Sequence, residues 1–308
     1  MSMRYTAGFI SAFYNPLKNP DAPTIGAATG GNASASVTFT APSNVGGSAI
    51  TGYTVVSSPS GITGTGTSSP VTVSGLTNGT AYTFKVFATN SYGPSVLSAA
   101  SNSVTPLAVP TVIGESFGGG FYAGQIGVSG VATHYLIIGP AASAQSSPLA
   151  YKIVNTATVG ADSVIDGPQN TADIVADGIS TVYPAGHFCN DLVIGGYSDW
   201  YLPAINELEV CYYNLKPTAS SNITSVGINP NAVPARSSNY TSGTPAITSA
   251  TAFQSTGAEA VSTGNYTWSS TEGSATGAGM KFFANGQQLP DVVKNYAANV
   301  RAIRRIPV

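Results

Sequence analysis

Short segments in the first third of the chain alternate apolar and polar residues with a period of two. Ser34–Pro42 places Val37 and Phe39 on one face, and Ile50–Pro59 repeats the alternation. Turns rich in Pro, Gly and Ser separate such segments at intervals of roughly ten residues. Because an alternating strand buries only one face, two sheets must pack together to cover the apolar faces. The pattern therefore predicts a β-sandwich over residues 21–107.

The stretch SGLTNGTAYTFKVFATNSYGPS, residues 74–95, carries a more specific signal. Leu76 is followed six positions later by Tyr82, which resembles the tyrosine corner of a fibronectin type III domain, where the phenol bonds to the upstream backbone. The Trp that is usual on the second strand of such domains is missing, and Phe39 takes its place. The resemblance implies a fibronectin type III sandwich over residues 21–107 that serves as a spacer.

Three motifs follow in a fixed order in the rest of the chain. They are GGYSDWYLPAINEL at 195–208, WSSTE at 268–272 and VRAIRRI at 300–306. Together they are similar to the Lcl C-terminal domain, a family with a C-type-lectin-like fold that occurs on bacterial adhesins and phage virion proteins. The resemblance implies an α+β domain over 114–308, after a Pro-punctuated linker at 108–113. The expected fold is therefore mainly β, with an α+β C-terminal domain.

Helices are predicted within this second domain. One has Asn170 or Thr171 as its N-cap, and a longer one carries Pro203 in its first turn. Apolar residues at spacings of three and four form one stripe along the longer helix: Ile205, Leu208, Tyr212 and Leu215. Glu207 and Glu209 lie near its N-terminus, two residues apart, so they point to different faces and do not form a catalytic pair.

Tryptophan and arginine in the motifs have structural interpretations. Trp200 and Trp268 are expected to fill large volumes in the core. Arg304 is expected to form an ion pair with Glu272 or Glu207. A basic patch for anionic glycans, made by the three arginines near the C-terminus, is the alternative.

Two regions are candidate binding surfaces. The nearly uncharged tract from residue 216 to 267 is rich in Asn, Ser, Thr, Tyr and Gly, a mixture typical of antibody paratopes; a loop that packs against other subunits is an equal alternative. The expected contact residues in this tract are Arg236, Asn239, Tyr240 and Phe253. Asn285-Gly286 predicts a hairpin with a type I′ turn in the region after WSSTE. By resemblance to lectin-like phage tropism proteins, its contact residues are Lys281, Phe283, Asn285, Gln287, Gln288, Asp291, Lys294 and Tyr296.

Composition excludes several other functions. Only 8% of the 308 residues are charged and the net charge is −2, which lacks the electrostatic footprint of a nucleic-acid binder. No apolar run approaches the ~20 residues of a membrane span, and the N-terminus does not have the form of a secretory signal. Cys189 and Cys211 are interpreted as small buried hydrophobes. No metal-ligand spacing, cofactor motif or catalytic triad occurs. We therefore expect no enzyme, cofactor or metal site.

These observations predict a phage virion surface protein, of the tail-fibre or receptor-binding type, made in the host cytoplasm. Residues 1–20 would attach it to other virion proteins, with the apolar patch Phe9–Tyr14 packing against a neighbouring chain. The lectin-like head would bind a host surface glycan or protein, and family likeness implies a homo-oligomer, with a trimer as the expected state. A capsid decoration or tail accessory protein without a receptor role is the main alternative, and a bacterial adhesin is another.

Overall fold

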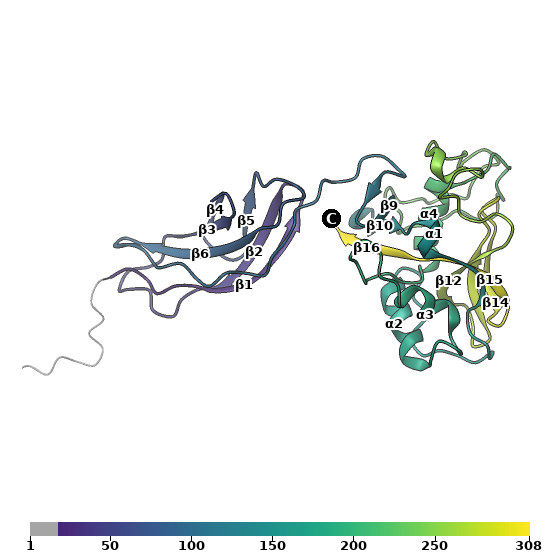
Figure 1. The fold of residues 1–308 in the computed structure, drawn as a ribbon, viewed down its shortest axis with the longest axis horizontal. Helices are drawn as coiled ribbons and strands as arrows, with labels where there is room; N and C mark the ends of the chain where they lie inside the picture. The colour runs from purple at the N-terminus through teal and green to yellow at the C-terminus, as the bar shows by residue number, and fades with distance from the viewer. Residues whose placement is uncertain (1–17) are drawn as a thin grey trace, which may run out of the picture. The chain divides into compact units, whose positions relative to one another are not determined.

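The computed structural model describes residues 18–308, which fold mainly as β-structure. The chain divides into two compact units, Met1–Val109 and Pro110–Val308 (Figure 1), and the division falls inside the linker expected at 108–113. Of the expected attachment segment 1–20, residues 1–17 lie outside the described part of the chain. Among residues 18–308, no helix is both long enough and apolar enough to span a bilayer.

The N-terminal unit is a sandwich of two antiparallel sheets. One sheet has the order β1-β2-β5 and the other β4-β3-β6-β7. The strands are β1 (Thr24–Gly31), β2 (Ser34–Thr40), β3 (Gly52–Ser58), β4 (Thr63–Gly66), β5 (Val71–Ser74), β6 (Thr83–Asn90) and β7 (Gly93–Pro94). Alternate residues of β2, β3, β5 and β6 are buried against one another, as the period of two predicts. The expected sandwich is therefore confirmed.

The tyrosine corner forms as expected. Tyr82 is buried, and its hydroxyl accepts a hydrogen bond from the backbone N–H of Thr77 at 3.1 Å. Phe39, which the sequence suggests in place of a Trp, is buried and packs against Tyr53 of the opposite sheet, with ring centroids 4.7 Å apart.

Three serines after β7 continue the pairing along the edge of β6. Ser95, Ser98 and Ser101 recur every third residue, opposite alternate residues of β6. Each serine pairs twice with one β6 residue: its N–H donates to that residue's carbonyl, and its hydroxyl accepts from that residue's N–H, at 2.7 to 3.1 Å. The partners are Ala88, Val86 and Phe84 respectively. Serine hydroxyls therefore take the place of backbone carbonyls along this edge, which satisfies the buried N–H groups of β6.

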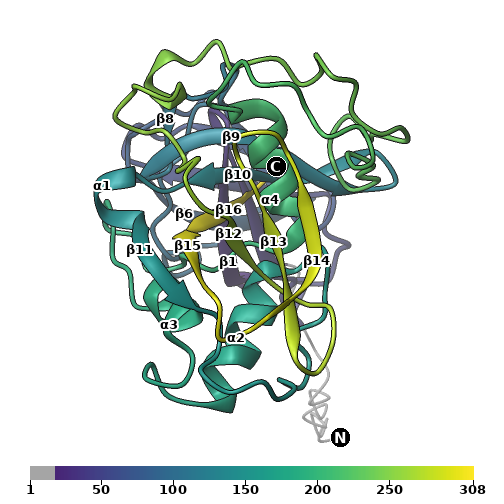
Figure 2. The ribbon, with the colours of Figure 1, turned by 90° about the vertical axis from the view of Figure 1, so that its right-hand side faces the viewer.

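The C-terminal unit contains two sheets and several short helices (Figure 2). One sheet has the order β16-β10-β9-β8 and the other β11-β15-β12-β13-β14. The strands are β8 (Ser116–Phe117), β9 (Gly120–Val128), β10 (Val131–Ile138), β11 (Gln145–Ala150), β12 (Thr267–Glu272), β13 (Gly277–Lys281), β14 (Gln288–Val293), β15 (Ala297–Arg301) and β16 (Ile303–Pro307). The helices are α1 (Ala141–Ala144), α2 (Gly167–Asp177), α3 (Pro184–Asn190), α4 (Ile205–Leu215) and the 3-10 turn η1 (Thr251–Phe253).

Helix α4 contacts both sheets, through β9 on one side and β12 and β13 on the other. The expected apolar stripe is buried, and it consists of Ile205, Leu208, Tyr212 and Leu215. Pro203 was expected in the first turn of the helix, but it lies before the N-cap Ala204. The helix begins two residues later because Glu207 caps it, accepting from the N–H of Ala204 at 2.8 Å.

Helix α2, in contrast, begins earlier than its sequence predicts. Neither Asn170 nor Thr171 is the N-cap, because Asp166 caps the helix by accepting from the N–H of Gln169. The side chain of Asn170 is buried and holds the preceding loop instead, bonding both the N–H and the carbonyl of Ser163. α2 and α3 pack against each other and against the five-stranded sheet.

The last strand of the chain is split between the two sheets. β15 ends at Arg301 and lies in the five-stranded sheet, whereas β16 starts at Ile303 and pairs with β10 in the other. Ala302 marks the change of sheet. Simple alternation therefore does not continue through the last motif, and the arginines on either side of Ala302 have unrelated surroundings.

Candidate ligand-binding surface

Helix α4 carries two buried carboxylates on different faces. Glu207 accepts from the N–H of Gly167 at 3.2 Å, from the Tyr201 hydroxyl at 2.6 Å and from Arg305 Nε at 2.6 Å. Burial raises the pKa of this carboxyl, and the Arg305 guanidinium opposes the rise. Glu207 thus ties α4 to the start of α2 and to β16, which is a structural role.

Glu209 faces the long tract that follows the helix. It accepts hydrogen bonds from Asn229 Nδ2 at 2.6 Å, from the Tyr240 hydroxyl, and from Arg236 in a close ion pair. The backbones of Asn229 and Arg236 also pair with each other, at 2.9 and 3.0 Å. One buried carboxylate therefore fixes three side chains of the tract to the most buried helix of the unit.

Further polar side chains hold the rest of the tract. Buried Lys216 donates to the carbonyls of Ser220 and Pro245. Asn222 is also buried; it accepts from the Tyr212 hydroxyl at 2.6 Å and donates to the carbonyls of Thr241 and Pro245. Because these groups satisfy the loop backbone from inside, the tract is ordered although, apart from η1, it has no helix and no strand before β12.

A cavity of about 290 Å³ opens on this tract. Its lining consists of Tyr213, Ala235, Arg236, Ser237, Ser238, Asn239, Tyr240, Thr241 and Thr244. The Arg236 guanidinium lies 4.0 Å from the centroid of the Tyr213 ring, and the Tyr240 ring lies 6.3 Å from that of Tyr213. Ser237, Ser238 and Asn239 are exposed, and within residues 18–308 their side chains form no hydrogen bond. These side chains remain available to a ligand.

Lys281 lies behind the Tyr240 wall of the cavity and is fully buried. Its ammonium donates to the Tyr240 hydroxyl at 3.0 Å and lies 5.0 and 5.1 Å from the rings of Tyr212 and Tyr240. Within the described part of the chain, no carboxylate lies at ion-pair distance from it. Burial lowers its pKa to about 8, the nearby Glu209 carboxylate opposing the change.

Several residues expected to contact a ligand are buried, which corrects those assignments. Phe253 and Phe283 are fully buried against Phe121 and Tyr212, with centroids 5.4 and 5.7 Å apart. Lys281 is enclosed as described above, and Lys294 forms an internal ion pair. A loop without regular structure needs apolar anchors in the core, so its few aromatic rings point inward. Tyr240 is buried too, although it lines the cavity.

The predicted hairpin after WSSTE forms, but not with a type I′ turn. β13 pairs with β14 from Lys281↔Gln288 onward, leaving six residues between the strands. The N–H of Gly286 bonds the carbonyl of Phe282. Only Gly286 has a positive φ, +77°, and a Cβ there would come within 2.5 Å of the Tyr212 ring. Close packing on α4 therefore sets the shape of the turn.

Polar groups of this hairpin are largely satisfied internally. Asn285 accepts from the N–H of Gln287, whose own side chain accepts from Tyr266. Gln288 accepts from Lys281, and Asp291 accepts from Ser274. Asp291 and Tyr296 are the exposed members of the predicted set. The hairpin is therefore a weaker candidate surface than the cavity on the long tract.

The terminal arginines do not pair as expected. Arg304 binds Asp199 through two hydrogen bonds of 2.8 Å and stacks 3.7 Å from the Tyr197 ring centroid. It pairs with neither Glu272, which pairs with Lys294 at 2.6 Å, nor Glu207, which pairs with Arg305. Trp200 and Trp268 are buried in the core as well.

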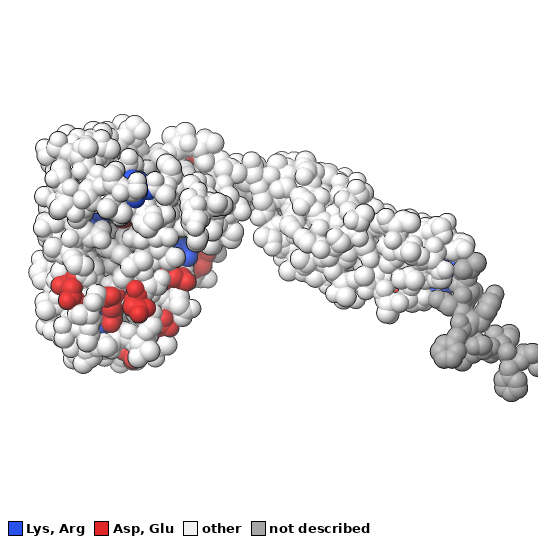
Figure 3. All heavy atoms as spheres, turned by 180° about the vertical axis from the view of Figure 1, so that it is seen from behind, with Lys and Arg blue, Asp and Glu red and all other residues white. Residues whose placement is uncertain are grey.

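Positive charge is almost absent from the surface of the C-terminal unit. Between Pro110 and Val308 every Lys and Arg is buried or half-buried, whereas five aspartates are exposed: Asp162, Asp177, Asp191, Asp199 and Asp291. Figure 3 shows acidic side chains gathered over one part of this unit. Arg301 and Arg304 are buried, so the last motif does not form the basic patch considered for anionic glycans.

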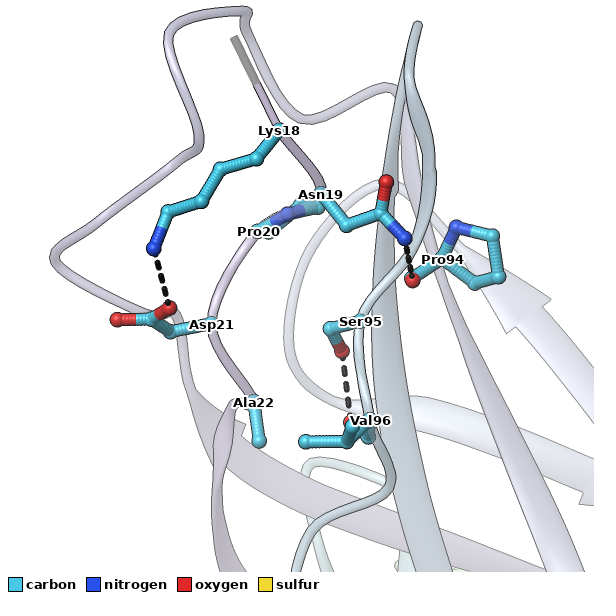
Figure 4. A pocket seen from close by; sticks show the side chains of 8 residues that line it. All are labelled: Lys18, Asn19, Pro20, Asp21, Ala22, Pro94, Ser95 and Val96. Carbon is cyan, nitrogen blue, oxygen red and sulfur yellow. Dashed lines mark hydrogen bonds and ion pairs between the residues drawn. The ribbon is translucent and has the colours of Figure 1, made fainter. Parts of the chain in front are cut away.

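A second cavity, of about 510 Å³, lies in the N-terminal unit (Figure 4). Its polar side chains already have partners: Lys18 lies 3.7 Å from Asp21, and Asn19 donates to the Pro94 carbonyl at 2.8 Å. The Ser95 hydroxyl donates to the Val96 carbonyl at 2.8 Å. With these groups engaged, the cavity offers fewer free polar side chains than the one on the long tract.

Reactive groups are few. Cys189 and Cys211 are free and buried, and burial raises the pKa of both thiols, so neither is a ready nucleophile. Among residues 18–308, no cluster of three or more His, Cys, Asp or Glu side chains could hold a metal ion.

Comparisons with known proteins identify the N-terminal unit. Residues 21–104 match the fibronectin type III domain family. Solved structures similar to this chain include domains A168–A170 of titin, 28% identical over 29% of this chain and 32% of that one, with a TM-score of 0.27. The chicken CNTN1 FN1–FN3 domains are 20% identical over 39% of this chain and 41% of that one, with a TM-score of 0.27. The Family 28 exopolygalacturonase of Yersinia enterocolitica is 21% identical over 30% of this chain and 21% of that one, with a TM-score of 0.26.

This chain spans about a third of the titin fragment's length. A search of curated proteins found no match.

Proposed function

We propose that this protein is displayed on the surface of a phage particle, as a tail fibre or receptor-binding component, and recognises the host cell through its C-terminal unit. The observation that carries the proposal is the tract 216–267. It is fixed from inside by Lys216, Asn222 and Glu209, yet it presents uncharged polar side chains to solvent. A fixed loop loses little conformational entropy on binding, which favours recognition.

The remaining parts of the chain fit this role. The fibronectin type III unit is a spacer, since its surface carries few charged residues. The three ordered motifs of the C-terminal unit resemble the Lcl C-terminal family, which implies a C-type-lectin-like head. Residues 1–20 attach the protein to other virion proteins, and association into a homo-oligomer, a trimer by family likeness, would multiply weak contacts into firm attachment. The role is binding, without catalysis.

Particle purification tests this proposal. Antibodies raised against the full-length protein should label purified particles at fibre tips, and the soluble protein should slow adsorption of those particles to their host. Absence of the protein from purified particles would refute the virion assignment. Labelling without any effect on adsorption would refute the receptor role.

A cementing role is the second candidate, and exposed apolar residues favour it. Val131, Val159 and Val193 of the C-terminal unit are 70%, 88% and 72% exposed. Side chains this exposed become buried if neighbouring subunits pack on them. In that case the label would lie flat over the shell, and removal of the protein would lower the resistance of particles to heat without changing adsorption.

A further inference from the structure

We propose that the cavity between Tyr213 and Tyr240 binds a neutral saccharide of one or two sugar residues. The inference rests on the proposed recognition function, and it names the ligand class and the site. The cavity volume, about 290 Å³, lies at the lower end of the range for small-molecule sites, about 300 to 1,000 Å³. A site of this size admits a short, compact ligand.

Charge around the cavity selects against ionic ligands. The positive charge of Arg236 is already paired with the buried carboxylate of Glu209, and its guanidinium is stacked on Tyr213. No Lys or Arg of the C-terminal unit is exposed, so an anionic ligand would lose its hydration without gaining a counter-charge. Glu209 is buried and fully engaged, so a cation has no free carboxylate in the lining.

Free groups of the lining match a polyhydroxylated ligand. The hydroxyls of Ser237 and Ser238 each donate and accept, and the Asn239 amide does both through separate atoms. These are the groups that pair with sugar hydroxyls, while the half-exposed Tyr213 ring offers an apolar wall to a pyranose face. A peptide would instead need an apolar pocket for an anchor side chain or a free strand edge, and the lining provides neither.

The site is also fixed before the ligand arrives. Arg236 and Tyr240 are held by Glu209, the Tyr240 backbone N–H bonds the Val226 carbonyl at 2.7 Å, and Asn222 holds the Thr241 carbonyl. Contacts on both flanks of the exposed residues 237–239 therefore set their positions. Such a site gains affinity because few torsions are frozen on binding.

The test uses the full-length protein, biotinylated and assembled on streptavidin to strengthen weak binding, on an array of neutral, sialylated and sulfated oligosaccharides and unglycosylated peptides. We expect binding to neutral oligosaccharides that persists at high salt. Asn239→Ala removes ligand hydrogen bonds but no internal one, and should weaken binding about tenfold. Asn295→Ala is the matched control, an exposed Asn outside the cavity, and should bind as the wild type.

Ser238→Trp provides a second variant, because its ring would fill the cavity from an exposed position and abolish binding while the protein stays folded. Binding confined to sialylated or sulfated sugars or to peptides, no binding at all, or wild-type binding by both cavity variants would each overturn the inference. The proposed function fails separately. If Asn239→Ala protein still slows particle adsorption, the proposed sugar site is wrong and the proposed function stands. If the protein is absent from particles but binds neutral sugars, the proposed function is wrong and the sugar site stands.

Discussion

Replacing Lys281 by Met is expected to stabilise the C-terminal unit. The ammonium is fully buried without an ion-pair partner among the described residues, and its pKa falls from 10.5 to about 8. At pH 7 this depression corresponds to about 3 kcal/mol of unfavourable energy for the charged form. Met keeps the aliphatic stem but loses the hydrogen bond to Tyr240 and the longer one, of 3.4 Å, to Gln288, together worth about 1 kcal/mol. The expected net gain in the free energy of unfolding is therefore about 2 kcal/mol.

The gain should shrink as the pH rises. Between pH 8 and 10.5 the unfolded chain holds the Lys281 proton while the folded chain has released it, so a higher pH favours the folded wild type. From pH 7 to pH 9 the release of this proton removes about 1 kcal/mol of the free-energy cost of burying Lys281 in the wild type. The advantage of Lys281→Met should fall by the same amount, to about 1 kcal/mol. Tyr212 and Tyr240 do not interfere, since burial raises the pKa of both hydroxyls well above this interval.

Urea unfolding followed by tryptophan fluorescence measures this change selectively. The chain has two Trp, Trp200 and Trp268, and both lie in the C-terminal unit. Lys216→Met is the matched control: Lys216 is also buried, but it bonds two loop carbonyls. Its replacement removes the donor to the Ser220 carbonyl and one of the two donors to the Pro245 carbonyl, which Asn222 also binds, so it should destabilise the unit. If Lys281→Met destabilises the unit at pH 7, or if its effect does not depend on pH, the assignment of Lys281 as an uncompensated charge is refuted.

Three further substitutions test other contacts. Ser98→Ala should lower the stability of the N-terminal unit by about 1 to 2 kcal/mol, because the buried Val86 N–H loses its acceptor. Ser95→Ala, at a less buried serine, should cost less. Equal effects of the two substitutions in thermal melts by circular dichroism would argue against the paired serine contacts with β6. Arg304→Met should cost the C-terminal unit about 2 kcal/mol, less than a fully buried pair because its acidic partner is half exposed; an unchanged urea midpoint by fluorescence would exclude the pairing. Glu207→Gln should cost about 3 kcal/mol by leaving the Arg305 guanidinium without its closest counter-charge; a loss below 1 kcal/mol in the same assay would contradict the described network.

The sandwich could be predicted from the sequence because its determinants are local. Alternation specifies which side of each strand faces inward, and the tyrosine corner joins Thr77 and Tyr82, only five residues apart. Short-range patterns of this kind survive in a linear sequence. The paired contacts of Ser95, Ser98 and Ser101 with β6 were not predicted, although the spacing of three residues is visible in the sequence.

Ion pairs could not be predicted in this way. Arg304 and its partner Asp199 are 105 positions apart, and Arg305 and Glu207 are 98 apart. Which acid meets which arginine depends on how β15 and β16 divide between two sheets at Ala302, a change that alternation alone does not reveal. The last motif shows where the arginines are, but the topology sets their partners.

The candidate surface was predicted in part. Composition singled out the tract from residue 216 to 267, and three of its four nominated residues, Arg236, Asn239 and Tyr240, line one cavity. What composition could not show is that Glu209, Asn222 and other internal polar groups hold that tract from beneath. Aromatic rings in a polar loop were interpreted as contacts, whereas Phe253 serves as an anchor in the core.

Scarcity of charge explains both the order of the loop and the character of the surface. Every Lys and Arg of the C-terminal unit is at least half-buried, and most are bound to carbonyls, carboxylates or rings inside it. The buried carbonyls of a long loop outside any sheet need hydrogen-bond donors. Buried ammonium and amide groups supply them here: Lys216 and Asn222 both donate to the Pro245 carbonyl. Because the cations lie inside, the surface carries hydroxyls and amides, together with the acidic side chains gathered over one part of the unit. Such a surface has no long-range attraction for anions, so its specificity must come from short-range hydrogen bonds and shape.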